Sequence, residues 1–230
     1  MRSTRLTRSL PRVALAAAAV ALAATGCAHT PDRPPATALN LHLTWRPTDN
    51  PRDLSGAGIM ALAQQRVSIT VAGDTRPEPK NQFGVNNEDP TPRPVTTPDD
   101  IDGFIATHLA GLLQANGVEV VPSGATRILS ITPMTFFVTE TGTYQVNVSF
   151  GVTLKDGGGK VLWQGAAVGS GHRWGHSFDP VNYIELAASG VFDALKNLLS
   201  NPAFQQAAAP SAPSAPPAAP SAPPAAPSHG

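Results

Sequence analysis

Apolar and polar positions alternate and then recur at helical spacing through the first half of the chain. Alternation over residues 67–72 predicts a half-buried strand. A polar segment, 73–97, follows and is interpreted as a long loop. Beyond it the spacing predicts a helix with Thr97 as N-cap and Asn116-Gly117 at its end. The apolar face of this helix consists of Ile101, Phe104, Ile105, Leu109 and Leu112.

Further strands and a closing helix are predicted downstream. The strand predictions cover residues 118–121, 127–138, 144–154 and 161–168. In the second of these the apolar parity changes across Pro133, which indicates a bulge or a sheet edge. The glycine-rich run from Asp156 to Gly159 predicts a hairpin loop. The closing helix is predicted to begin with Asp179 as N-cap and Pro180 at its first position.

The order strand, helix, four strands, helix predicts an α+β fold. We expect a mainly antiparallel sheet of about five strands with two amphipathic helices packed on one face. The folded domain is predicted to cover residues 39–202. Residues 53–65 give no clear prediction, because Gly56 and Gly58 weaken a helix there.

The start of the chain has the pattern of a bacterial lipoprotein signal. Four arginines precede an apolar run, 13–24, which is 12 residues long and therefore too short to span a bilayer as a helix. The run ends in Ala24-Thr25-Gly26-Cys27, which resembles a lipobox and contains the only cysteine of the chain. We expect residues 1–26 to be removed and Cys27 to be acylated. An ordinary secretory signal with an incidental cysteine is the alternative.

Both ends of the mature chain are predicted to be linkers. Residues 27–38 are rich in proline and form a tether behind the lipidated cysteine. Residues 203–230 form a Pro/Ala/Ser-rich tail that is expected to be disordered. This tail is either a spacer or docking strip for an envelope partner, or a solvated tail without a partner.

The charge balance argues against nucleic acid as a partner. The chain has 16 basic and 16 acidic residues, whereas a nucleic-acid binder is usually basic. Residues 1–26 hold four arginines and no acid, so the mature chain has 12 basic and 16 acidic residues, a formal charge of −4. Because anionic lipid would weakly repel it, attachment to the membrane must come from acyl chains on Cys27.

Candidate catalytic chemistry is sparse. Ser149 lacks the context of a hydrolase nucleophile. His172 and His176 with Asp179 have a spacing that could bind a metal, but flanking glycines argue against the helix that would bring the two histidines together. His108 is interpreted as a core residue rather than a ligand. We therefore predict no enzyme activity, no cofactor and no metal site, and keep a metal-dependent enzyme as a remote alternative.

The polar segment 73–97 is the predicted contact surface. A loop of this length in a compact domain is usually functional or disordered. Phe83 is its only aromatic residue, and Arg76 and Arg93 could form polar contacts around it. A mobile surface loop without a partner is the alternative.

The layout resembles the YajG-type lipoproteins, a family of unestablished function. The residues that carry the resemblance are Cys27, Asp74-Thr75-Arg76, Asn116-Gly117-Val118, Phe136, Tyr144, Val161, Gly169-Ser170-Gly171 and Asn182. The resemblance implies an outer-membrane lipoprotein that faces the periplasm. Ala28 fits this location, because Asp at that position is the usual inner-membrane retention mark.

Two functions follow from these patterns. The first is a lipid-anchored, non-catalytic binding or scaffolding module of the cell envelope, whose partner is an unidentified envelope protein. The second is an accessory lipoprotein subunit of an envelope transport or lipid-export machine.

Overall fold

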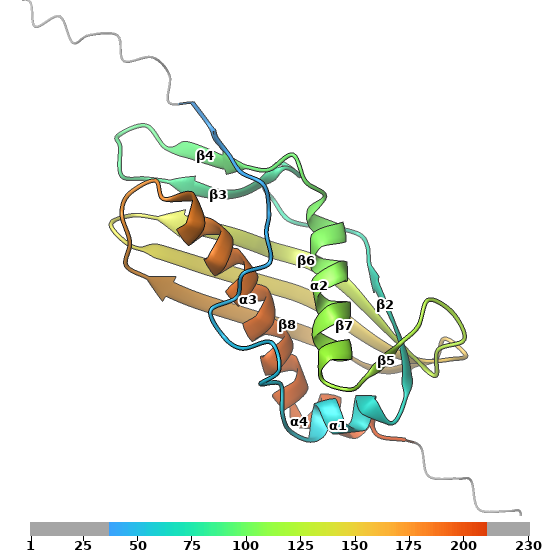
Figure 1. Ribbon diagram of the computed structural model, residues 1–230. Helices are drawn as coiled ribbons and strands as arrows, with labels where there is room; N and C mark the ends of the chain where they lie inside the picture. Colours follow the sequence, from blue (N-terminus) through green and yellow to red (C-terminus); the bar gives the residue numbers. More distant parts are fainter. Residues whose placement is uncertain (1–36, 211–230) are drawn as a thin grey trace, which may run out of the picture. The chain divides into compact units, whose positions relative to one another are not determined.

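The structure, a computed structural model, describes residues 37–210, which form eight strands and four helices (Figure 1). The strands are β1 Leu39–Asn40, β2 Arg66–Val71, β3 Gln82–Asn86, β4 Arg93–Thr96, β5 Glu119–Val120, β6 Arg127–Glu140, β7 Tyr144–Asp156 and β8 Val161–Arg173. The helices are α1 Ala57–Ala63, α2 Ile101–Ala115, α3 Pro180–Ser200 and α4 Pro202–Ala208. The predicted signal peptide, Cys27, nearly all of the tether and the tail beyond residue 210 lie outside the described residues.

The sheet is mixed rather than mainly antiparallel, and it has eight strands rather than about five. β6, β7 and β8 are the three long strands and pair antiparallel along their length, as predicted. The other edge of β6 is shared, because β2 pairs parallel with its first half and β3 parallel with its second half. β4, β1 and β5 complete the sheet. The parallel pairs of β6 with β2 and β3 arise because α2 and its flanking loops return the chain across the sheet before β6 begins.

The predicted irregularity at Pro133 is a β-bulge. The register between β6 and β7 shifts between Pro133 and Thr135, which leaves Met134 46% exposed. The buried positions are odd-numbered before the bulge and even-numbered after it. The backbone NH of Thr75 donates to the carbonyl of Pro133, so the chain leaving β2 crosses β6 at this bulge.

The two long helices lie over one face of the sheet (Figure 1). α2 begins later than predicted: its N-cap is Asp100, whose carboxylate accepts from the backbone NH of Asp102. Thr97 is buried and instead accepts a hydrogen bond from the NH of Asp99. The predicted end is confirmed, because Asn116 is the C-cap and Gly117 follows with φ 84°.

α3 begins as predicted, with Asp179 as N-cap and Pro180 in its first turn. Its side chains also bind the free edge of β8. Asp193 accepts from the backbone NH of Ser170, and Asn197 donates to the carbonyl of Val168. The edge is therefore partly satisfied within the chain, which limits its pairing with other strands.

The prediction that disorder begins at residue 203 is wrong for α4. Asn201 caps this helix by accepting from the backbone NH groups of Ala203 and Phe204. Phe204 is fully buried, with its ring centroid 5.3 Å from that of Trp163. The folded domain therefore extends to the end of α4, beyond the predicted limit of residue 202. No helix within residues 37–210 combines the length and apolarity needed to cross a membrane.

The segment before α1 packs across the helical layer. The backbone NH of Thr48 donates to Ser189 of α3, and that of Leu43 donates to Asp99 ahead of α2. The ring of Trp45 stacks on His108 of α2 at 4.4 Å. Burial lowers the pKa of His108 below its usual value, in keeping with its interpretation as a packing residue.

Candidate functional site

The three predicted contact residues do not form an exposed loop. Residues 82–96 of segment 73–97 form the hairpin of β3 and β4. Phe83 is 0% exposed and lies 6.2 Å from Phe136, centroid to centroid, so it is a core residue. Arg76 is also buried, at 5%. The exposure on which the predicted contact rested is therefore wrong for both residues.

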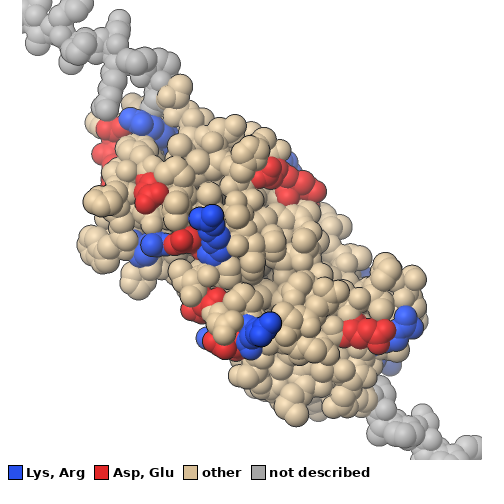
Figure 2. All heavy atoms as spheres, in the orientation of Figure 1, with Lys and Arg blue, Asp and Glu red and all other residues tan. Residues whose placement is uncertain are grey.

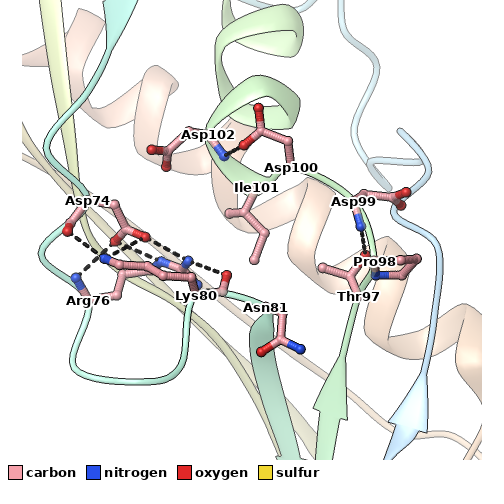
Figure 3. Close-up of a pocket in the computed structure, with 10 residues that line it drawn as sticks. All are labelled: Asp74, Arg76, Lys80, Asn81, Thr97, Pro98, Asp99, Asp100, Ile101 and Asp102. Atoms are coloured by element: carbon pink, nitrogen blue, oxygen red, sulfur yellow. Dashed lines mark hydrogen bonds and ion pairs between the residues drawn. The ribbon is translucent and has the colours of Figure 1, made fainter.

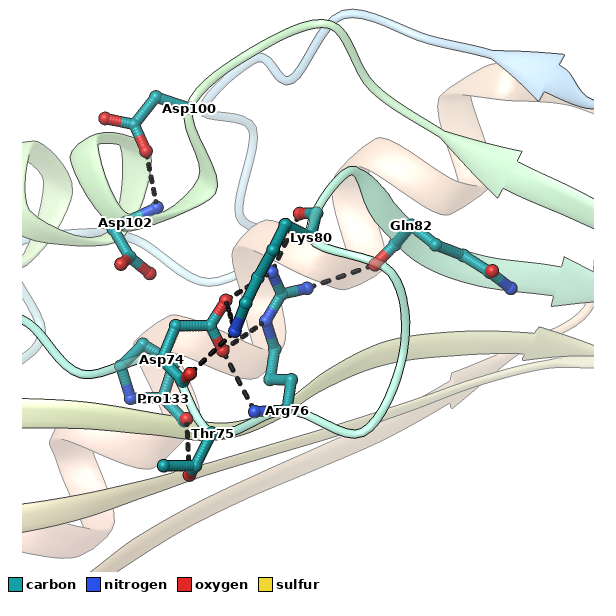
Figure 4. Close-up of polar contacts among 8 residues, drawn as sticks. All are labelled: Asp74, Thr75, Arg76, Lys80, Gln82, Asp100, Asp102 and Pro133. Carbon is teal, nitrogen blue, oxygen red and sulfur yellow. Dashed lines mark hydrogen bonds and ion pairs between the residues drawn. The ribbon is translucent and has the colours of Figure 1, made fainter.

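Arg76 fixes the conformation of the chain between β2 and β3 (Figure 4). Its guanidinium binds both carboxylate oxygens of Asp74, at 3.0 and 2.9 Å. It also donates to the backbone carbonyls of Lys80 and Gln82. Because these contacts use most of the hydrogen-bond donors of the guanidinium, Arg76 has a structural role and few donors remain for a partner.

Arg93 is partly buried at the opposite end of the hairpin strands. It pairs with Asp89, and its guanidinium lies 4.3 Å from the centre of the Phe178 ring. Arg93 therefore joins the β3–β4 hairpin to the loop between β8 and α3. The three residues of the predicted contact thus have three separate structural roles.

A polar pocket of about 520 Å³ lies between segment 74–81 and the start of α2 (Figure 3). Burial by itself would raise the pKa of Asp74, but hydrogen bonds from Arg76 and Lys80 outweigh it and lower that pKa to about 2. Burial raises the pKa of Asp102, and the negative charge of Asp74 adds to the shift. Asp102 Oδ1 is enclosed and has no hydrogen-bond partner among the described residues.

Apart from the carboxylate of Asp102, the charged side chains that line the pocket already have partners. Lys80 pairs with Asp74 at 3.0 Å, so Arg76 and Lys80, the two cations of the lining, share one carboxylate as their partner. Asp99 accepts from the backbone NH of Leu43, and Asp100 caps α2. Within residues 37–210 there is no group of three or more histidine, cysteine, aspartate or glutamate residues arranged to hold a metal ion.

The histidines of the possible metal site have other surroundings. His172 lies on β8, opposite Gln145 of β7. His176 lies in the following loop, where its carbonyl accepts from the hydroxyl of Tyr144 at 2.6 Å. Asp179 is used as the N-cap of α3, accepting from the NH of Val181.

The face of β6, β7 and β8 that points away from α2 and α3 is the larger candidate surface, here called the outer sheet face. Lys155 is its only charged position between residues 128 and 172. Thr135, Ser149 and Val168 form one row across the three strands, and Val168 is 55% exposed. Its other members include Ser130, Thr132, Met134, Thr139, Gln145, Asn147, Thr153, Gln164, Ala166 and Ser170.

The two faces of the sheet differ in their charge. Figure 2 shows the helix-covered side, where acidic and basic side chains lie beside one another in several small groups. At the outer sheet face a hollow of about 360 Å³ is lined instead by Gln145, Asn147, Ser170 and His172, together with Val146 and Gly171. Charged residues are depleted at the centre of protein interfaces, and the outer sheet face shares this low charge. The strand alternation that predicted these positions is the sequence signal for it.

No protein-family model and no curated protein matches the chain. A DUF330 protein from Xanthomonas campestris is similar in structure at 14% identity, covering 73% of this chain and 97% of that one, with a TM-score of 0.47. A proposed lipoprotein from Caulobacter crescentus has 11% identity over 66% and 93% of the two chains, with a TM-score of 0.35. The PelC dodecamer from Paraburkholderia phytofirmans has 20% identity over 59% and 88%, with a TM-score of 0.34. These values are too low to assign a family or transfer a function.

Proposed function

We propose that the chain is a lipid-anchored lipoprotein of the cell envelope, of the YajG type, located in the outer membrane and facing the periplasm. The run Ala24-Thr25-Gly26-Cys27 supports the anchor, because it ends a short apolar stretch and contains the only cysteine. Acyl chains on that cysteine would hold an acidic mature chain at the membrane without electrostatic attraction.

The folded domain is proposed to act as a non-catalytic binding or scaffolding module. The observation that carries this proposal is the outer sheet face. It has one charged position, and it exposes Met134 and Val168 at 46% and 55%. An exposed sheet face with few charges favours contact with another protein, since little charge has to be desolvated there. The partner is proposed to be another envelope protein.

The anchor is tested by replacing the cysteine. Cys27→Ser should abolish incorporation of radioactive palmitate and leave an uncleaved or soluble precursor. The native chain, labelled in parallel, is the control. Palmitate that persists in the Cys27→Ser protein would contradict acylation at this residue.

The binding surface is tested by placing charge on it. Met134→Glu combined with Val168→Glu should leave the melting temperature nearly unchanged, because both side chains are exposed. The same change should remove the envelope protein that crosslinks to a photoreactive group at Ser149. Met60→Glu on α1, where the side chain is 65% exposed, is the matched control and should leave the crosslink intact. A crosslink that survives the double change would rule out this face. The identity of the crosslinked protein separates a scaffolding role from a transport machine.

A further inference from the structure

Trp174 is strongly exposed in the loop between β8 and α3. Its side chain is 78% exposed, whereas Trp45 and Trp163 are partly buried against the core. Single exposed apolar residues are common, but tryptophan combines a large apolar ring with a polar NH. The surroundings of this residue indicate what the ring contacts.

The loop that carries this tryptophan is fixed by buried groups. Tyr144, which is 1% exposed, donates to the carbonyl of His176 and accepts from the NH of Asp179 at 3.0 Å. Glu140, which is 0% exposed, accepts from the NH of Phe178, also at 3.0 Å. The exposed ring is therefore held outward by a rigid scaffold rather than by a frayed segment.

The chain enters the domain beside this loop. β1 runs parallel to β4 with Leu39 opposite Val95, so the described chain enters at the end of β4 that carries Arg93. The guanidinium of Arg93 lies over the ring of Phe178, within the loop. The β3–β4 hairpin and the start of α3 lie together at this end in Figure 1, and α1 and α4 lie at the other.

The tether limits how far this end can lie from the membrane. Cys27 and Thr37 are 37 − 27 = 10 residues apart, which spans at most about 35 Å when extended. The 21 residues of α3 extend about 30 Å away from this end. Gly58 of α1 packs against Leu199 at the far end of that helix, so Met60 lies there too. An acylated Cys27 thus favours the loop end over the α1 end as the part next to the bilayer.

We propose that the ring of Trp174 inserts into the headgroup region of the bilayer that holds the acyl chains of Cys27. This inference rests on the proposed lipid anchor and adds an orientation to it. Tryptophan favours this region because its ring is apolar and its NH can still bond to water or headgroups. Val181, in the first turn of α3 and 39% exposed, adds apolar surface at the same end.

The contact depends on the ring rather than on attraction to anionic lipid. The two arginines at this end are already paired, Arg93 with Asp89 and Arg173 with Glu185. Binding by paired charges gains little from anionic headgroups. Insertion of the ring is therefore expected to be no stronger in vesicles that contain phosphatidylglycerol than in zwitterionic vesicles.

The test uses the full acylated chain, reconstituted into phosphatidylcholine vesicles whose acyl chains carry bromine, which quenches nearby tryptophan. Trp45→Phe with Trp163→Phe leaves Trp174 as the sole tryptophan. The matched reporter carries these two changes with Trp174→Phe and Met60→Trp. Trp45→Phe and Trp163→Phe alter rings that pack against the core. A second measurement therefore keeps both rings, and takes the quenching of Trp174 from the difference between the emission spectra of the native chain and of Trp174→Ser. We expect emission from Trp174 to shift to shorter wavelength and to be quenched several-fold more than emission from the α1 reporter.

The outcomes distinguish failure of this inference from failure of the proposed lipid anchor on which it rests. Palmitate labelling with no quenching of Trp174 overturns the inference and leaves the anchor standing. Equal quenching of both reporters overturns the assigned orientation. If position 174 crosslinks to a protein and its fluorescence is not quenched, Trp174 contacts a protein partner and not the bilayer, and the inference is overturned. Absence of palmitate label removes the anchor, and the inference is overturned with it.

Discussion

A Cβ atom on Gly169 of β8 would lie 2.0 Å from the carbonyl oxygen of Gly190 on α3. No real side chain fits at that distance, so glycine at this position allows the helix to pack directly on the strand. The contact lies beside the two side chains of α3 that bond the edge of β8, Asp193 and Asn197. Close backbone approach and edge protection are therefore features of one interface.

We predict that Gly169→Ala destabilises the domain by about 1–3 kcal/mol, because the helix must move away from the strand. The measurement is urea unfolding followed by circular dichroism. Gly151→Ala in β7 is the matched control, since its Cβ would meet its nearest neighbour at 3.6 Å, an ordinary contact. That control should change stability by no more than about 1 kcal/mol. Equal losses in both variants would contradict the role assigned to the close approach.

A second prediction concerns the C-terminal boundary. Phe204→Ala should cost about 3–5 kcal/mol, because the ring is fully buried against Trp163. For a domain of this size each kcal/mol lowers the melting temperature by roughly 2–4 °C. A chain ending at residue 202 should lose at least as much, whereas a chain ending at residue 210 should melt like the full chain. Equal melting of both truncated chains would show that α4 contributes nothing.

The long elements were predictable because their apolar positions repeat over many residues. Apolar and polar residues alternate along the whole of β7, and apolar residues recur at helical spacing along α3. Both patterns are stronger than any local signal for another structure. β3 and β4 were missed because they are short, with Pro94 within β4, and because β3 pairs with the distant strand β6. α4 did have a signal, Asn201 followed by Pro202, which the composition of the tail outweighed.

The candidate site was less predictable for a different reason. An arginine in a polar segment is usually exposed, and only the fold places Arg76 against Asp74, Lys80 and Gln82. The outer sheet face, by contrast, follows from strand alternation alone. The closeness of the Trp174 loop to the first described residues could not be predicted from the sequence, because it depends on the pairing of β1 with β4.

A third prediction concerns the buried carboxylate of Glu140. It accepts from the side chains of Asn86 and Tyr183 and from the NH of Phe178. Glu140→Ala leaves two buried donors and one partly buried donor without an acceptor, and should cost about 3 kcal/mol or more. Tyr183→Phe removes a single donor and should cost less. Hydrogen exchange at the Phe178 amide should accelerate strongly in Glu140→Ala, because the bond that fixes this loop is lost. Unchanged exchange there would contradict its role in holding the loop.

The last prediction concerns acid stability and Asp74. Burial would raise the pKa of this carboxyl, but hydrogen bonds from Arg76 and Lys80 prevail and lower it from 3.8 to about 2. A carboxyl whose pKa is lower in the folded state stabilises the fold above its unfolded pKa, and this contribution is lost as the pH falls through the folded value. The shift corresponds to roughly 2 kcal/mol, present above about pH 4 and lost towards pH 2.

Asp74→Asn should therefore be less stable than the native chain at pH 7, and the difference between the two should shrink between pH 4 and pH 2. Urea unfolding at a series of pH values measures this difference directly. Glu119→Gln is the control, because its pair with Arg66 is largely exposed, at 63% and 49%, and should be worth no more than about 1 kcal/mol. Since the native chain and Asp74→Asn share every other acid, titration of those groups largely cancels in the comparison. A difference that stays constant from pH 7 to pH 2 would show that Asp74 acts through packing and not through its charge.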